Sequence, residues 1–93
     1  MQVESPESYD VALCAHCQME GCSEAAVLVA ELSATRCRLR DALRDAPSGS
    51  ALSLWLGAIG PIASRVGRHG PAGQEIEFLA PLDPAILGHF AAR

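Results

Sequence analysis

Three cysteines and a histidine fall within the nine-residue stretch CAHCQMEGC, from Cys14 to Cys22. Thiolate and imidazole groups bind zinc, and closely spaced cysteines joined by a more distant one hold many iron–sulfur clusters. The two-residue gap between Cys14 and Cys17 lets both sulfur atoms reach one metal ion without strain. We therefore expect a metal site formed by Cys14, Cys17, Cys22 and His16, holding either zinc or a [4Fe–4S] cluster.

A bound metal would also help a chain of this size to fold. The sequence has 93 residues, which is one small domain. Such a domain buries only about two-thirds of the surface that its unfolded chain exposes, so its core leaves a slim margin of stability. The hydrophobic fraction of 49% is nevertheless ample for a globular fold. We expect metal binding to supply part of the folding free energy.

The pattern of leucines predicts one long helix over residues 23–46. At 100° per residue, Leu28, Leu32, Leu39 and Leu43 fall on one stripe. The serine at residue 23 suits a helix N-cap, and the Pro-Ser-Gly segment after residue 46 would end the helix. The sequence therefore predicts a mainly α fold with one long central helix, a Cys-rich metal-binding loop and a short β segment near the C-terminus.

The segments before this helix are expected to be short. Residues 1–10 form a polar lead-in, and residues 11–22 form the Cys-rich segment, with a short helix possible over residues 10–19. Glycine at residue 21 would end that helix, because glycine adopts the left-handed conformation readily.

The C-terminal half, residues 50–93, is expected to mix helix and strand. Leu52–Leu56 fits either a strand or a buried helix, because leucine alternates there with other residues. Pro61–Arg68 is expected to be a short helix. Gln74–Pro81 alternates apolar and acidic residues and is the best strand candidate. An aspartate and a proline then open a closing helix over Ala85–Ala92.

The fourth ligand of the expected metal site is open. If residues 23–46 form one helix, Cys37 lies about 21 Å along it from residue 23, too far to join the other cysteines in a monomer. Cys37 is then better explained as a small buried residue. The remaining candidates are His16, His69, His89 and a residue of another chain. An open position, as catalytic metal sites keep, is a further alternative.

A second interpretation is thiol–disulfide chemistry. The segment Cys14-Ala15-His16-Cys17 resembles the Cys-Pro-His-Cys active site of the DsbA-type oxidoreductases, with alanine at Ala15 where that family has proline. The resemblance covers these residues alone. It implies that Cys14 and Cys17 cycle between dithiol and disulfide, with His16 stabilising a thiolate.

Charge and hydropathy exclude some classes of protein. The net charge of −4 argues against general nucleic-acid binding, which depends on neutralising phosphates. The longest mostly apolar stretch, residues 51–63, is too short for a bilayer, which needs about 20 residues. The N-terminus has neither the basic start nor the apolar run of a signal peptide. We therefore expect a cytoplasmic protein that binds neither membrane nor nucleic acid.

These observations favour a non-catalytic role over an enzymatic one. We expect a small accessory, assembly or regulatory protein that acts through protein–protein interaction, with a protein partner or a second copy of itself. Trp55 is expected to join the core with its neighbouring leucines; if it is exposed instead, the contact surface lies around Trp55, with the exposed part of the leucine stripe as the other candidate. The alternatives are the redox protein described above and, third, an enzyme that uses a three-cysteine metal site with an open position.

Overall fold

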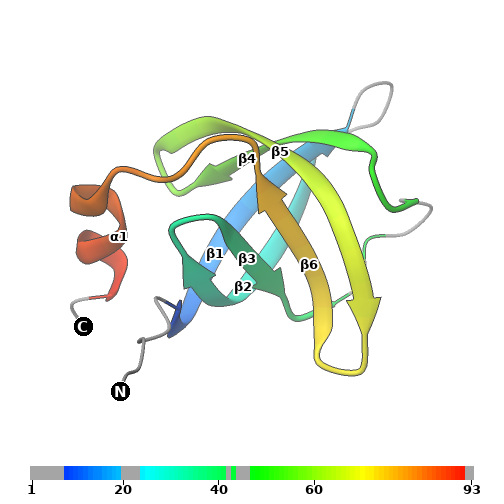
Figure 1. Ribbon diagram of the computed structural model, residues 1–93, viewed down its shortest axis with the longest axis horizontal. Helices are drawn as coiled ribbons and strands as arrows, with labels where there is room; N and C mark the ends of the chain where they lie inside the picture. Colours follow the sequence, from blue (N-terminus) through cyan, green and yellow to red (C-terminus); the bar gives the residue numbers. More distant parts are fainter. Residues whose placement is uncertain (1–7, 20–23, 42, 44–46, 92–93) are drawn as a thin grey trace, which may run out of the picture.

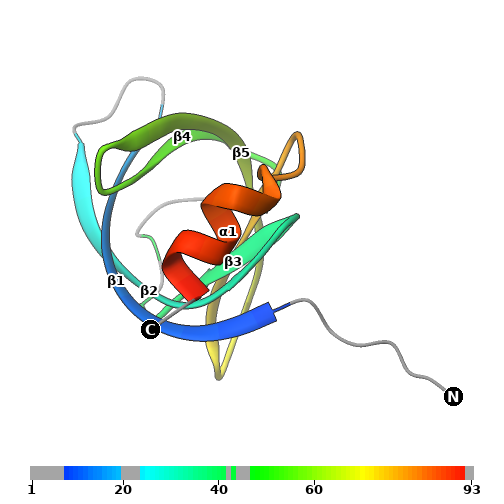
Figure 2. The ribbon, with the colours of Figure 1, turned by 90° about the vertical axis from the view of Figure 1, so that its left-hand side faces the viewer.

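The computed structural model describes residues 8–19, 24–41, 43 and 47–91. Within them the chain forms a closed barrel of antiparallel strands in the order β1-β2-β3-β6-β5-β4, and one helix lies across an end of the barrel (Figures 1 and 2). The elements are β1 (Ser8–Met19), β2 (Ala25–Ser33), β3 (Arg36–Leu39), β4 (Ala51–Leu56), β5 (Ile59–Gly70), β6 (Gly73–Phe78) and α1 (Pro84–Ala91).

The prediction of a mainly α fold is therefore wrong, and so is the long helix over residues 23–46. That segment contains β2, a tight turn and β3. The leucines of the expected stripe do not share one face. Two steps along β2, from Val29 to Glu31, match one step along β3, and this β-bulge turns Leu32 into the barrel while Leu28 stays on the outside. Leu39 is also buried but belongs to β3, so the helical spacing joined residues of two strands and of both faces of the sheet.

The Ser33 side chain starts the turn between β2 and β3. Its hydroxyl accepts the N–H groups of Thr35 at 3.3 Å and Arg36 at 3.1 Å, and donates to the Arg36 carbonyl at 3.0 Å. Serine hydroxyls that bind nearby backbone in this way compete with helix formation. Ser33 is also almost fully buried, so water has little access to its hydroxyl. The bonds to Thr35 and Arg36 satisfy the hydroxyl in place of water.

The expectations for the other segments have mixed outcomes. The strand predicted at Gln74–Pro81 is confirmed as β6, and the closing helix is confirmed as α1, where Asp83 Oδ1 accepts the N–H of Ala85 at 2.8 Å. The open choice at Leu52–Leu56 resolves as strand β4. The short helices expected over residues 10–19 and 61–68 are wrong, because those residues lie in β1 and β5.

The core fills the inside of the barrel. Leu52, Leu54 and Leu56 point inward from β4, as period-two alternation requires. At one end, Ile86, Leu87 and Phe90 of α1 pack against the same core and close it. The buried apolar residues are Ala15, Cys17, Val29, Leu32, Cys37, Leu39, Leu52, Leu54, Leu56, Val66, Ile76, Phe78 and Leu82.

Candidate functional site

The clustered cysteines lie on β1, and the strand separates them. Successive side chains of a strand point to opposite faces of the sheet. Cys14 and His16 are exposed on the outside of the barrel, whereas Ala15 and Cys17 are buried inside it. Because Cys14 and Cys17 point to opposite faces, they cannot share a metal ion or form a disulfide without a rearrangement of β1. Cys22 lies outside the described residues.

Cys17 and Cys37 both belong to the buried core. Cys37 is 3% exposed, which confirms its interpretation as a small buried residue. Burial, with a smaller contribution from Cys17, raises the pKa of the Cys37 thiol to about 12. Burial and the charge of Glu24 also raise the pKa of Cys17. Both thiols are therefore protonated at neutral pH, and a protonated thiol is a poor nucleophile and a poor metal ligand.

The metal-binding interpretation is not supported by the described residues. Among them, no group of three or more His, Cys, Asp or Glu side chains is placed to hold a metal ion. His69 lies on β5, and His89 lies on α1 with its ring 5.0 Å from the Phe90 ring, edge to face. In the part of the chain that the structure describes, the prediction of a zinc or iron–sulfur site is therefore unsupported, and the prediction of a helical protein is wrong.

The outer surface carries the more informative pattern. The register places His16 of β1 beside Ala26 of β2 and Trp55 of β4, and it pairs Cys14 with Leu28. One step along the barrel, Gln18, Ser53 and Ala63 form the next row. None of these outward side chains is an acid, a lysine or an arginine. We call this surface the Trp55 face: Cys14, His16, Gln18, Ala26, Leu28, Ser53, Trp55, Pro61 and Ala63.

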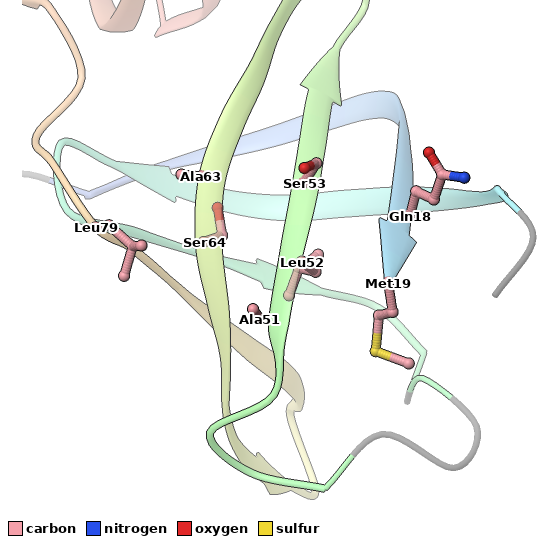
Figure 3. Close-up of a pocket in the computed structure, with 8 residues that line it drawn as sticks. All are labelled: Gln18, Met19, Ala51, Leu52, Ser53, Ala63, Ser64 and Leu79. Carbon is pink, nitrogen blue, oxygen red and sulfur yellow. The ribbon is translucent and has the colours of Figure 1, made fainter. Parts of the chain in front are cut away.

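A shallow groove of about 370 Å³ adjoins the Trp55 face and shares Gln18, Ser53 and Ala63 with it (Figure 3). The small side chains of Ala51, Ser53 and Ala63 line the groove along β4 and β5, and we call this part its floor. Figure 3 shows Leu79 on one side of these strands and Met19 on the other. The N–H of Leu79 donates to the Ala63 carbonyl at 2.9 Å, which holds this wall against β5. The lining is Gln18, Met19, Ala51, Leu52, Ser53, Ala63, Ser64 and Leu79, with no charged side chain.

Trp55 is held beside this groove by Gly60. The backbone at Gly60 has φ of +150°, and the Gly60–Pro61 peptide is cis. A Cβ added at Gly60 would lie 2.7 Å from Trp55 Cδ1 and 2.8 Å from the Leu54 carbonyl oxygen. Only glycine leaves room for the indole ring here, so the ring can pack against the backbone of β5 while strand alternation directs Trp55 outward.

Charged side chains gather on the other side of the barrel, on β2, β3, β6 and β5. Arg38 Nε lies 3.2 Å from Glu31 Oε1 and forms an ion pair across β2 and β3. Oppositely charged residues face each other in the other cross-strand pairs as well, an arrangement that stabilises sheets. We call this set the charge ladder: one row is Arg36, Glu77 and Arg65, and the next is Glu31, Arg38 and Glu75.

Sequence reasoning had singled out Trp55, Cys14 and His16 but missed the groove beside them. The signal for it was available in part, since inward Leu52, Leu54 and Leu56 imply that Ser53 and Trp55 point outward. The contribution of Ala63 and Leu79 could not be found, because it depends on the pairing of β4 with β5 and on the segment after β6.

Comparisons of the chain with protein-family profiles and with curated proteins gave no match. Within the described residues, no helix has both the length and the apolar character needed to cross a membrane.

Proposed function

We propose that this chain is a small non-catalytic binding protein, an accessory or regulatory factor that acts through protein–protein contact. Its contact surface is the Trp55 face. The observation that supports this most is the distribution of charge: the charge ladder runs across β2, β3, β6 and β5, and the nine side chains of the Trp55 face include no acid, lysine or arginine.

Such a surface has the composition of an interface centre. Charged residues are depleted at the cores of protein interfaces, and aromatic residues are enriched there. Tryptophan is also among the residues that most often dominate binding free energy. Trp55 lies on the Trp55 face with exposed His16 as its cross-strand neighbour. Association would bury these groups without leaving an unpaired charge in a dry environment.

We place this activity in the cytoplasm. The three described cysteines, Cys14, Cys17 and Cys37, are free thiols, and Cys14 is exposed on the Trp55 face. Thiols of this kind stay reduced in the cytosol, whereas secreted domains of this size commonly carry disulfides.

Site-specific photo-crosslinking in cells tests the proposal. A photoreactive amino acid replaces His16 on the Trp55 face or, as a matched control, Glu77 on the charge ladder. Both positions are exposed on strands. We expect a discrete covalent adduct from position 16, identified by mass spectrometry, and none from position 77. Equal labelling from both positions, or no adduct from position 16, would contradict the proposal.

A further inference from the structure

The Trp55 face carries a row of large side chains next to a row of small side chains. His16 and Trp55 form the first row, and Ser53 and Ala63 form the floor of the groove in the second. Trp55 and Ser53 are two residues apart on β4 and point outward together, which separates the rows by about 7 Å. A row of large side chains and a groove therefore lie side by side on one surface.

We propose that the partner of the Trp55 face is a second copy of this chain, related by a two-fold axis. This inference rests on the proposed function. In a two-fold interface, if residue i contacts residue j of the partner, then j contacts i. An axis between the two rows places Trp55 of each copy over the Ser53–Ala63 floor of the other. The groove volume of about 370 Å³ has room for an indole ring.

Charge favours a second copy over a charged partner. Each chain carries a net charge of −4, so two copies repel each other at long range. The outward positions of the Trp55 face carry no acid, lysine or arginine, and the charge ladder reaches the strands of this face only at Glu31 of β2 and Arg65 of β5. Two such faces can meet without placing like charges in contact, whereas an acidic or basic partner would find no complementary group.

The closed barrel also restricts how two copies can meet. An open sheet associates through the unpaired backbone of its edge strands, and closing the barrel removes those edges. Contact is therefore made face to face, through side chains of β1, β2, β4 and β5. The side chains of the Trp55 face form an uncharged surface suited to this contact.

The small size of the Trp55 face indicates a weak dimer. A standard interface removes about 800 Å² per partner, and the whole surface of this chain is 5760 Å². The Trp55 face occupies parts of four strands and falls below the roughly 20 to 30 residues that such an interface contributes per side. We expect a reversible dimer with a Kd in the micromolar range, on the order of 10–100 µM.

Analytical ultracentrifugation and tryptophan fluorescence together test the proposed dimer. The chain has one tryptophan, so its emission reports Trp55 directly. Between about 1 µM and about 1 mM, we expect the average mass to rise from monomer toward dimer. The Trp55 emission should shift to shorter wavelength over the same range, because the indole leaves water.

Two matched variants locate the contact. Ala63→Glu places a carboxylate on the groove floor, and Ala85→Glu makes the same change on exposed α1. We expect Ala63→Glu to weaken dimerisation at least about tenfold, as a buried unpaired charge should, and Ala85→Glu to leave it unchanged. His16→Glu, at an exposed position of β1, provides a second variant with the same expected effect.

Several outcomes would overturn the second-copy proposal. One is a wild-type chain that remains monomeric at the highest concentration, and another is a dimer that Ala63→Glu and His16→Glu leave intact. If the wild type is monomeric while position 16 crosslinks to a different protein, the second-copy proposal fails and the proposed function stands. If position 16 gives no adduct of any kind, the proposed function fails as well.

Discussion

Trp55 lies over Gly60, and a Cβ at residue 60 would come within 2.7 Å of the indole Cδ1. The indole ring thus packs closely against the backbone of β5 on the outside of the barrel, which restricts the movement of this side chain. Preorganised aromatic groups lose little conformational entropy on binding. The pair therefore links the local backbone of β5 to the function proposed for the Trp55 face.

Replacing Gly60 with alanine should displace Trp55 and destabilise the barrel. Both the positive φ and the short contacts oppose a side chain at this position, so we expect a loss of about 2–4 kcal/mol in the free energy of unfolding. Urea unfolding measures the loss, and the emission maximum of Trp55 reports the displacement. Gly70→Ala is the control, because a Cβ there meets no atom within 4 Å. Equal stability of the two variants would contradict the placement of Trp55.

Thiol labelling should separate the cysteines by face. In a Cys22→Ser background, we expect Cys14 to react promptly with an aromatic disulfide reagent, while Cys17 and Cys37 react only when the barrel opens. The native protein should then show one prompt thiol, and the urea-unfolded protein should show three. Adding Cys14→Ser should abolish the prompt reaction. Two prompt thiols in the native chain would show that β1 does not hold Cys17 inside.

The buried Cys37 thiol predicts a loss of stability at high pH. Its folded pKa of about 12 lies above the ordinary value of 9.0, so the unfolded chain releases this proton first as the pH rises. The stability contribution is complete below about pH 9 and is lost between about pH 9 and 12, at up to about 1.4 kcal/mol per pH unit.

Urea unfolding between about pH 8 and pH 10.5 measures this effect in the wild type and in Cys37→Ala. The difference between the two proteins removes the contributions of other groups that titrate in this range. The wild type should lose stability more steeply above pH 9 than Cys37→Ala does. Parallel curves for the two proteins would show that Cys37 is not buried in the folded chain.

Ser33→Ala should weaken the β2–β3 hairpin. The substitution leaves the N–H groups of Thr35 and Arg36 without the hydroxyl that accepts them, which costs about 1–3 kcal/mol when the site is buried. Ser48→Ala is the control, because its hydroxyl bonds the Gly67 carbonyl at an exposed site. Thermal unfolding should show a clearly larger decrease in Tm for Ser33→Ala. A decrease no larger than that of Ser48→Ala would contradict this account of the turn.

The sequence predicted the elements whose pattern is local. The alternation around Ile76 and Phe78 identified β6, and the Asp83-Pro84 pair identified the start of α1. The helix over residues 23–46 was wrong because its leucine stripe joined different strands and faces: a bulge in β2 leaves Leu28 outside and turns Leu32 inside, and Leu39 belongs to β3. Residue spacing alone does not distinguish a bulged strand from a helix, since the bulge depends on pairing with β3.

The candidate site was predictable only in part, for a similar reason. The close spacing of Cys14 and Cys17 suggested a shared site, but that spacing places the two thiols together only in a loop or helix. In a strand the same spacing sends one outward and the other inward. Trp55 was named as a candidate for the contact surface, and its role there stays a proposal. Its neighbours Ser53 and Ala63 come from three-dimensional pairing that no local pattern reveals.

The most direct test of the contact surface is a concentration series of amide spectra of the isotopically labelled chain. We predict that the amides of Cys14, His16, Ser53 and Ala63 shift with rising protein concentration, whereas those of Arg36 and Glu77 do not. Spectra that stay unchanged up to about 1 mM, or shifts concentrated on the charge ladder, would contradict a dimer formed through the Trp55 face.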